Sequence, residues 1–396
     1  MLISVKSIGT LSEKVRYSSE TFCSGLFLSA RWFAVSQLDH DGFQLIVLPD
    51  KDSAEYCAAD LYNLIEGDRV FFLPDSGKTL ERSNYKSTLS VQRTSAIGKI
   101  LEYKEGRLIV VTYPSALEEG IPDSTIIKES VLRLTVGDEI SHEGIVEAMF
   151  ASGFQRVDFV AEPGQFAIRG AIVDIFSYSY NDPFRISFFG DEIDSITVFD
   201  CNTQLSKEKI NSAEIYPDIA SADEEGELSS ICSIIPEDAV VWLDSSDMYK
   251  NKSFFTELER FRRIFMELPL SRQDEEAVRF KISPQPVFNK NFELLTEDIR
   301  KRLEENYRVR IYGEKQSQLD RLKSILSQNG GILPEFISGC NIHNGFIDHE
   351  CMVCCYSDHE IFDRFHRVSI RRTVEKSEQL TINDLTSFAI GDYIVH

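Results

Sequence analysis

Two arginines and a pair of phenylalanines in one short stretch have side chains that suit protein recognition. Arg169, Arg185 and the dipeptide Phe188-Phe189 all fall between residues 153 and 200. Arginine offers a planar fork of donors that fits a carboxylate, and phenylalanine offers a large apolar anchor. Neighbouring residues of a strand point to opposite faces, so Phe188 and Phe189 would lie on different faces of a sheet. An arginine and one phenylalanine on an exposed face would form a protein-binding patch.

The residues around these side chains predict a small module built mainly of β-strands. Residues 155–160 alternate polar and apolar side chains, as in a half-buried strand. A Pro-Gly turn at 162–165 leads to a second extended run over 166–176, in which Gly170 predicts a bulge or a close backbone approach. Two further runs around Gly190-Asp191-Glu192 predict a hairpin; they cover 185–189 and 193–199. A helix over 142–152, ended by Gly153, would lead into this α+β module with a mostly antiparallel sheet.

The module carries a long and unusual pattern that resembles one protein family. The matching stretches are GFQRVDFVAEPGQFAIRGAIVDIF from Gly153, PFRISFFGDEIDSITVFD from Pro183 and TQLS from Thr203. They resemble the UvrB-like module at the N-terminus of the bacterial transcription-repair coupling factors (Mfd). The resemblance implies that this module binds UvrA through the surface that UvrB also uses, and that Arg169, Arg185 and Phe189 face UvrA.

Structural alternatives remain open for these positions. Arg169 could instead form an ion pair with Glu162 or Asp174, and Phe189 could lie in the core with Phe188 pointing outward. If the arginines face a partner, replacing one should cost about 2 kcal/mol of binding free energy, with little loss of folding stability.

The rest of the first 283 residues predicts an α/β domain with a parallel sheet. Short apolar runs alternate with amphipathic stretches, which is typical of such a sheet. The expected strands are 43–48, 70–73, 108–112 and 240–244, and the expected helices are 53–65, 92–102 and 252–268. The last helix would expose Arg260, Arg262 and Arg263. The family resemblance implies that residues 1–126 and 216–283 form a degenerate RecA-like domain, with the module at 127–215 inserted.

Neither candidate phosphate loop in this domain has the residues that nucleotide binding requires. Such a loop needs two glycines separated by four residues, followed by Lys and Ser or Thr. The stretch around Gly25 has one glycine and no lysine, and Ser76-Gly77-Lys78-Thr79 lacks the first glycine. Asp244 ends a strand as a Walker B aspartate does, but Ser245 follows instead of a glutamate. We therefore expect no nucleotide cofactor and no ATPase activity in this chain.

Residues 284–372 predict a second, small α/β domain. Helices are expected over 296–306 and 316–328, and strands over 308–312 and 352–356. Residues 373–396 are expected to be a linker followed by FAIGDYIVH, which in the family opens the RNA-polymerase-interacting domain. The resemblance implies that RNA polymerase, DNA and ATP are bound by domains that this chain lacks.

The cysteines predict reduced thiols and no metal site. Cys351, Cys354 and Cys355 lie in an apolar run, where neighbouring side chains point to opposite faces, and no second pair with zinc-ligand spacing follows. The eight cysteines of this long chain do not form a disulfide framework.

The charge balance argues against strong DNA binding by this chain. Its net charge is −22, whereas binding to phosphates needs a basic surface. The sequence contains no run of 18 apolar residues that could span a membrane, and its N-terminus has no signal layout, so a cytoplasmic protein is expected.

Two other functions remain as alternatives. One is an ATP-dependent helicase or nuclease subunit, and the other is a DNA-binding module that uses Arg260, Arg262 and Arg263 or Arg371-Arg372.

Overall fold

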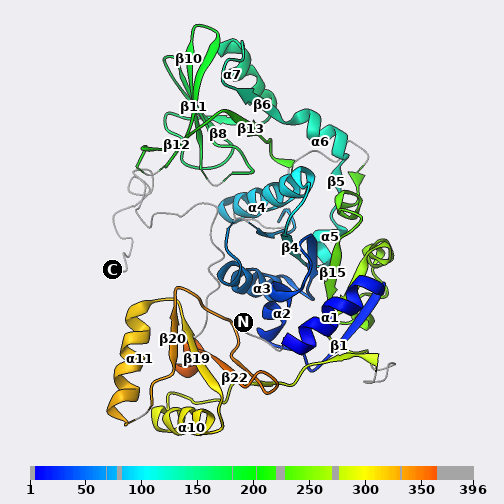
Figure 1. The fold of residues 1–396 in the computed structure, drawn as a ribbon. Coiled ribbons are helices and arrows are strands. Elements are labelled where there is room, and N and C mark those ends of the chain that lie inside the picture. The colour runs from blue at the N-terminus through cyan, green and yellow to red at the C-terminus, as the bar shows by residue number, and fades with distance from the viewer. Residues whose placement is uncertain are drawn as a thin grey trace, which may run out of the picture. The chain divides into compact units, whose positions relative to one another are not determined.

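The computed structural model describes most of the chain as two compact units. The described residues are 5–67, 69–77, 83–180, 182–201, 203–219, 228–269, 276–330 and 332–363. One unit contains the described residues of 5–132 and 216–363, and the other contains those of 133–215. The first unit holds two sheets with helices packed on them, and the second is mostly antiparallel (Figure 1). The fold is therefore mixed α/β, as the sequence predicts.

A seven-stranded sheet forms the centre of the first unit. Its strands, in spatial order, are β17 (Val278–Arg279), β1 (Glu20–Ser24), β16 (Arg262–Phe265), β15 (Val240–Leu243), β2 (Phe43–Val47), β4 (Leu108–Thr112) and β3 (Val70–Phe72). All neighbouring strands in this sheet pair in parallel. Strands β2, β4 and β15 are buried along their whole length, which explains their unbroken apolar sequences. The predicted strands at 43–48, 70–73, 108–112 and 240–244 are confirmed.

Helices connect these strands, and some of them begin after a residue whose side chain caps the first turn. The helices are α1 (Val5–Tyr17), α2 (Ala30–Gln37), α3 (Lys51–Leu64), α4 (Ser83–Glu102), α5 (Pro114–Glu118), α6 (Ser124–Ser130), α8 (Ser246–Tyr249) and α9 (Ser253–Glu257). Asp50 caps α3 by accepting a hydrogen bond from the Ser53 amide at 2.9 Å. The predicted helix at 53–65 is confirmed, and the one at 92–102 is the second half of the longer α4. Short strands β5 (Ile121–Pro122) and β14 (Leu228–Ser229) pair beside the sheet.

The predicted helix over 252–268 is wrong. Only α9 and a short 3-10 turn at Leu258–Arg260 are helical, and the chain then forms β16 between β1 and β15. A central strand is buried on both faces, so its apolar run has no period that separates it from a helix.

The three arginines of this segment consequently do not lie on an exposed helix face. Arg263 is 8% exposed and pairs with Glu20 at 2.8 Å. Arg260 and Arg262 donate to the backbone carbonyls of Cys232 and Asp238. Each of these three guanidinium groups thus has a partner within the protein, and Arg260 remains exposed. Arg371 and Arg372 lie outside the described residues.

The second unit is a six-stranded sheet with a helix packed against it. The strands, in spatial order, are β12 (Ser206–Ile210), β11 (Glu192–Phe199), β10 (Phe184–Phe189), β9 (Ile172–Ile175), β8 (Gln165–Arg169) and β7 (Gln155–Arg156). Strands β6 (Leu132–Thr135) and β13 (Ser212–Ile215) form a separate pair. Helix α7 (His142–Ala151) packs on the larger sheet, where His142 meets Phe188 edge to face (Figure 1). Gly153 follows it with a φ of 76°, as a helix C-terminus favours.

Two details of this module differ from the prediction. The extended run over 166–176 is a hairpin, because β8 and β9 pair antiparallel with Arg169 opposite Ile172. Gly170 therefore sits in the turn, with a φ of 62°, and does not form a bulge. The strand expected over 155–160 is only β7, and it pairs with β8 in parallel. The hairpin of β10 and β11 is confirmed.

A five-stranded sheet follows in the first unit. Its strands, in spatial order, are β18 (Ile282–Pro284), β21 (Phe346–Asp348), β22 (Val353–Ser357), β19 (Arg308–Gly313) and β20 (Glu335–Ser338). Helices α10 (Phe292–Glu304) and α11 (Gln316–Gln328) pack on it through Leu295, Ile299 and Leu322, and α12 (Asp358–Ile361) follows β22 (Figure 1). The predicted helices and strands of this region are confirmed within a few residues.

Buried hydrogen bonds join this second sheet to the start of α2. The Ser29 hydroxyl donates to the Asp60 carboxylate at 2.6 Å, and the backbone amides of His343 and Asn344 donate to Asp60 and Ser29 at 2.8 and 2.9 Å. Asp60 is 2% exposed, and burial raises its pKa to about 7. The contact therefore contains a carboxyl group that ionises near neutral pH.

The first prediction is that Asp60 makes stability depend on pH between about 4 and 7. An unfolded aspartate has a pKa of about 3.9. In this window the folded chain binds the proton more tightly, so the free energy of unfolding falls as pH rises. Asp60→Asn mimics the neutral acid and should flatten this dependence. Urea unfolding at pH 5 and pH 8 measures it, with the exposed Asp52→Asn on the same helix as control. Identical pH profiles for Asp60→Asn and the wild type would contradict the assignment.

Candidate protein-binding surface

Three neighbouring strands of the module bring the two predicted arginines to one carboxylate. Asp174 on β9 lies directly opposite both Arg185 on β10 and Ala167 on β8. Arg169 is two residues beyond Ala167, so it points to the same face. Ser187 and Phe189 continue that face along β10 in steps of two. We call this side of the sheet, with Arg169, Asp174, Arg185 and Phe189, the arginine face.

Asp174 is buried between the two guanidinium groups. It is 1% exposed, and its carboxylate accepts from Arg185 Nε at 2.8 Å and from Arg185 Nη2 at 3.0 Å. Arg169 Nη2 donates to the same carboxylate. A buried carboxylate needs such partners, because desolvation of an unpaired charge costs several kcal/mol. Two positive groups surround one negative group, so the cluster keeps one net positive charge.

Arg185 is fixed by further contacts on its other side. Its guanidinium lies 4.2 Å from the centre of the Phe199 ring, and Nη2 donates to the Gln204 side-chain oxygen at 3.2 Å. Its side chain is 19% exposed. Arg185 is therefore held in one orientation by Asp174, Phe199 and Gln204.

Arg169 is more accessible than Arg185. Its side chain is 37% exposed, and its guanidinium lies 5.4 Å from the centre of the Phe159 ring. Of the two acidic partners that the sequence left open, Asp174 is the one that Arg169 contacts. The ion pair with Asp174 leaves part of the Arg169 guanidinium group facing solvent. Arg169 can therefore form this ion pair and still contact a partner.

The two phenylalanines point as the binding hypothesis requires. Phe189 is 82% exposed, whereas Phe188 is 8% exposed and meets His142 with ring centres 5.8 Å apart. The irregular pairing between Ser187 and Phe188 leaves the alternation along β10 intact. An apolar ring thus lies in solvent on the same face as the arginines.

Sequence reasoning missed the residues that position Arg185. Phe199 and Gln204 lie on and beside β11, and neither has a charge that marks it as a partner for arginine. Gln204 adopts a φ of 59°, which turns the chain back toward Arg185. The stretch Thr203 to Ser206 was visible in the sequence only as part of the family pattern.

Two residues that the sequence marked as candidates for nucleotide binding, Gly25 and Asp244, make contacts within the protein. Gly25 has a φ of 68°, and a Cβ there would lie 2.2 Å from the Phe280 carbonyl oxygen. Asp244 pairs with Arg31 of α2 at 2.7 Å, and both side chains are largely buried. Burial raises the pKa of the Asp244 carboxyl, and Arg31 opposes that shift. Lys78 and Thr79, part of the second candidate loop, lie outside the described residues.

The cysteines near residue 351 separate into different surroundings. Cys354 and Cys355 are consecutive on β22, and they pack in the two hydrophobic clusters on opposite faces of the sheet. Burial raises the pKa of the Cys354 thiol to about 12. Within the part of the chain that the structure describes, no three His, Cys, Asp or Glu side chains are grouped so that they could hold a metal ion.

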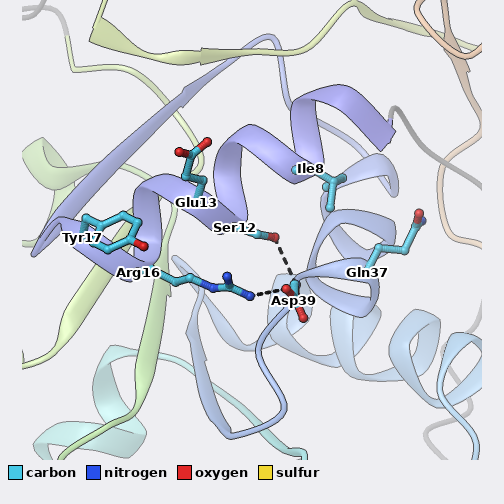
Figure 2. A pocket seen from close by; sticks show the side chains of 8 residues that line it. Ile8, Ser12, Glu13, Arg16, Tyr17, Gln37 and Asp39 are labelled. Carbon is cyan, nitrogen blue, oxygen red and sulfur yellow. Dashed lines mark hydrogen bonds and ion pairs between the residues drawn. The ribbon is translucent and has the colours of Figure 1, made fainter.

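A cavity of about 590 Å³ opens between α1 and the end of α2. Figure 2 shows Arg16 and Ser12 both pointing to Asp39, which lines the cavity with them. Arg16 pairs with the Asp39 carboxylate, and the Asp39 amide donates to the Ser12 hydroxyl at 3.1 Å. These polar groups are engaged with one another, so the arrangement does not resemble a catalytic site.

Comparisons with known proteins match the segment of the chain that contains the arginine face. The family model of the UvrB interaction domain matches residues 132–220, which contain that face. The chain is 30% identical over 201 residues to the transcription-repair-coupling factor of Bacillus subtilis (strain 168), which is 50% of this chain and 17% of that protein. It is 31% identical over 191 residues to the transcription-repair-coupling factor of Mycobacterium tuberculosis (strain CDC 1551 / Oshkosh). That match covers 46% of this chain and 15% of that protein.

A relative with a different name matches as well. The UvrABC system protein B of Methanococcus maripaludis is 28% identical over 185 residues, covering 46% of this chain and 28% of that protein. The matched region thus spans about a sixth of the coupling factors. The resemblance to transcription-repair coupling factors predicted from the sequence is confirmed. None of the described helices has the length and apolar character needed to cross a bilayer.

The second prediction is that the two arginines differ in their effect on folding. Arg185→Ala should lower the free energy of unfolding of the module by about 3 kcal/mol, because it leaves the buried Asp174 with one donor group. Arg169→Ala should cost less, since Arg185 still holds the carboxylate. Both tryptophans, Trp32 and Trp242, lie in the other unit. Hydrogen exchange of the β8, β9 and β10 amides therefore provides the readout.

Two further variants control this comparison. Arg133→Ala removes an arginine of the same unit that is 72% exposed and pairs with Glu214, and it should change little. Adding Asp174→Asn to Arg185→Ala removes the uncompensated charge and should recover part of the loss. Equal exchange in Arg185→Ala and Arg133→Ala would contradict the structural role of Arg185.

Proposed function

We propose that this chain is the N-terminal part of a transcription-repair coupling factor, and that it recruits UvrA to RNA polymerase stalled at DNA lesions in nucleotide excision repair. The observation that carries the proposal is the arginine face. An accessible arginine and a phenylalanine that is 82% exposed share one side of a sheet in the segment that matches the UvrB interaction domain. A protein partner would bury these groups.

In this proposal each residue of the face has its own role. Arg169 presents part of its fork to a carboxylate or carbonyl of UvrA, and Phe189 inserts as an apolar anchor. Arg185 contributes positive charge from a fixed position, since three neighbours hold it. Asp174 keeps both guanidinium groups in place before binding, so little side-chain freedom is lost when the partner docks.

We also propose that the seven-stranded sheet is a degenerate RecA-like domain without ATPase activity. A parallel sheet, a glycine loop between β1 and α2, and an aspartate at the end of β15 support this assignment. The Asp244 carboxylate is neutralised by Arg31 at 2.7 Å, and the loop at Gly25 is packed against Phe280. Binding of RNA polymerase, DNA and ATP would then belong to other domains of such proteins.

The third prediction tests recruitment. Purified chain should bind purified UvrA without DNA or ATP, as measured by calorimetry. Arg169→Ala and Phe189→Ala should each raise the dissociation constant about tenfold or more, because each removes a central anchor. Arg133→Ala serves as the matched arginine control in the same unit. If the folded Arg169→Ala and Phe189→Ala variants bind as tightly as the wild type, the assigned surface is wrong.

The fourth prediction tests the nucleotide site. Millimolar Mg-ATP should leave the melting temperature of the chain unchanged, because a ligand that binds only the folded state would raise it. Phosphate release should equal that of a boiled sample. A saturable rise in melting temperature that Asp244→Asn abolishes would overturn the proposal of a degenerate site.

A further inference from the structure

Two exposed apolar side chains lie beside the arginine face in loops that the protein fixes. Phe159 is 63% exposed and Leu205 is 68% exposed. Large apolar side chains in solvent lower solubility and add nothing to the core, whereas burying them against a partner would be favourable. Neither belongs to the family-derived set of Arg169, Arg185 and Phe189.

The loop that carries Phe159 is pinned at both ends. The Val157 amide donates to the Phe166 carbonyl at 2.9 Å. Val160 is 1% exposed and packs with Ala167 and Phe176. The backbone amides of Ala161 and Glu162 donate to the side-chain oxygen of Gln165 at 2.9 and 3.0 Å. The loop thus buries its other large apolar residue and holds the aromatic ring of Phe159 outward.

The loop that carries Leu205 is also closed by hydrogen bonds. The Asp200 amide donates to the Leu205 carbonyl at 2.9 Å, and the Gln204 amide donates to the Asp200 carbonyl at 2.8 Å. Gln204 in turn accepts from Arg185. Leu205 therefore follows directly after a residue that positions the arginine pair.

A continuous series of contacts connects the two loops. Phe159 touches Arg169, Arg169 and Arg185 share Asp174, and Arg185 reaches Gln204, next to Leu205. The charged centre thus has an exposed apolar group at each end. Fixed apolar side chains bind at low entropic cost, and a surrounding apolar rim excludes water from a central ion pair.

We propose that Phe159 and Leu205 are part of the docking surface, and that they receive apolar side chains flanking an acidic group on UvrA. This inference rests on the proposed function and extends its site from one apolar anchor to three. One net positive charge at the centre favours an acidic group there, and the exposed ring and leucine favour apolar neighbours on each side. The ring of Phe159 also limits the orientations open to Arg169.

The test compares binding of the purified full chain to purified UvrA by calorimetry at two salt concentrations. Phe159→Ala and Leu205→Ser should each raise the dissociation constant about fivefold or more, and they should do so equally at 50 and 300 mM salt. Arg169→Ala should lose affinity mainly at low salt, because its contribution is electrostatic. Phe159→Leu should keep more affinity than Phe159→Ala, since it retains apolar area. Tyr17→Ala is the control, because Tyr17 is an aromatic residue of the other unit that is 83% exposed.

The outcomes separate this inference from the proposed function. If the wild type binds, Arg169→Ala weakens binding, and both Phe159→Ala and Leu205→Ser stay within twofold of the wild type, the extension alone is overturned. If the wild-type chain does not bind UvrA, the proposed function and the extension both fall. Hydrogen exchange of β8 and β10 confirms that each variant is folded, and a variant that unfolds is replaced by Phe159→Leu or Leu205→Ala.

Discussion

The buried carboxylate of Asp174 is the group on which the arginine face of the module depends. A carboxylate that is 1% exposed in the middle of a sheet must be compensated, and Arg169 and Arg185 do so. The pairing fixes the register of β8, β9 and β10 chemically, because a slip of one residue would turn Asp174 into the opposite, apolar face. It also fixes two long, mobile side chains before any partner arrives. A single buried charge thus orients both arginine side chains of this face.

The residues around the two arginines also hold side chains in fixed orientations. Phe199 and Gln204 hold Arg185, and the pinned loop at 157–165 holds Phe159 beside Arg169. A chain with a net charge of −22 presents here a small centre of positive charge between exposed apolar groups. Such a mixture is typical of a protein interface and unlike a surface for nucleic-acid phosphates, which needs many spread basic groups.

In the first unit, contacts within the protein occupy the residues that follow the central strands of the parallel sheet. Arg31 pairs with Asp244 within the protein, and the backbone at Phe280 lies against Gly25. Hydrogen bonds from His343 and Asn344 reach Asp60 and Ser29 at the start of α2. These hydrogen bonds connect the helices that pack on the parallel sheet to the segment that precedes β21 of the five-stranded sheet.

The sequence by itself determined the features that depend on neighbouring residues. Apolar runs predicted the buried parallel strands, and the turn at Gly190 predicted the β10–β11 hairpin. The long pattern from Gly153 showed the family resemblance, which in turn implied the three candidate residues. Only the tertiary structure decided which acidic residue pairs with Arg169, which of Phe188 and Phe189 faces solvent, and that Arg262 to Phe265 is a strand. Each of these depends on strand register or on burial between elements far apart in sequence. No local pattern encodes such pairing, because the free energy that selects it arises only when the strands are assembled.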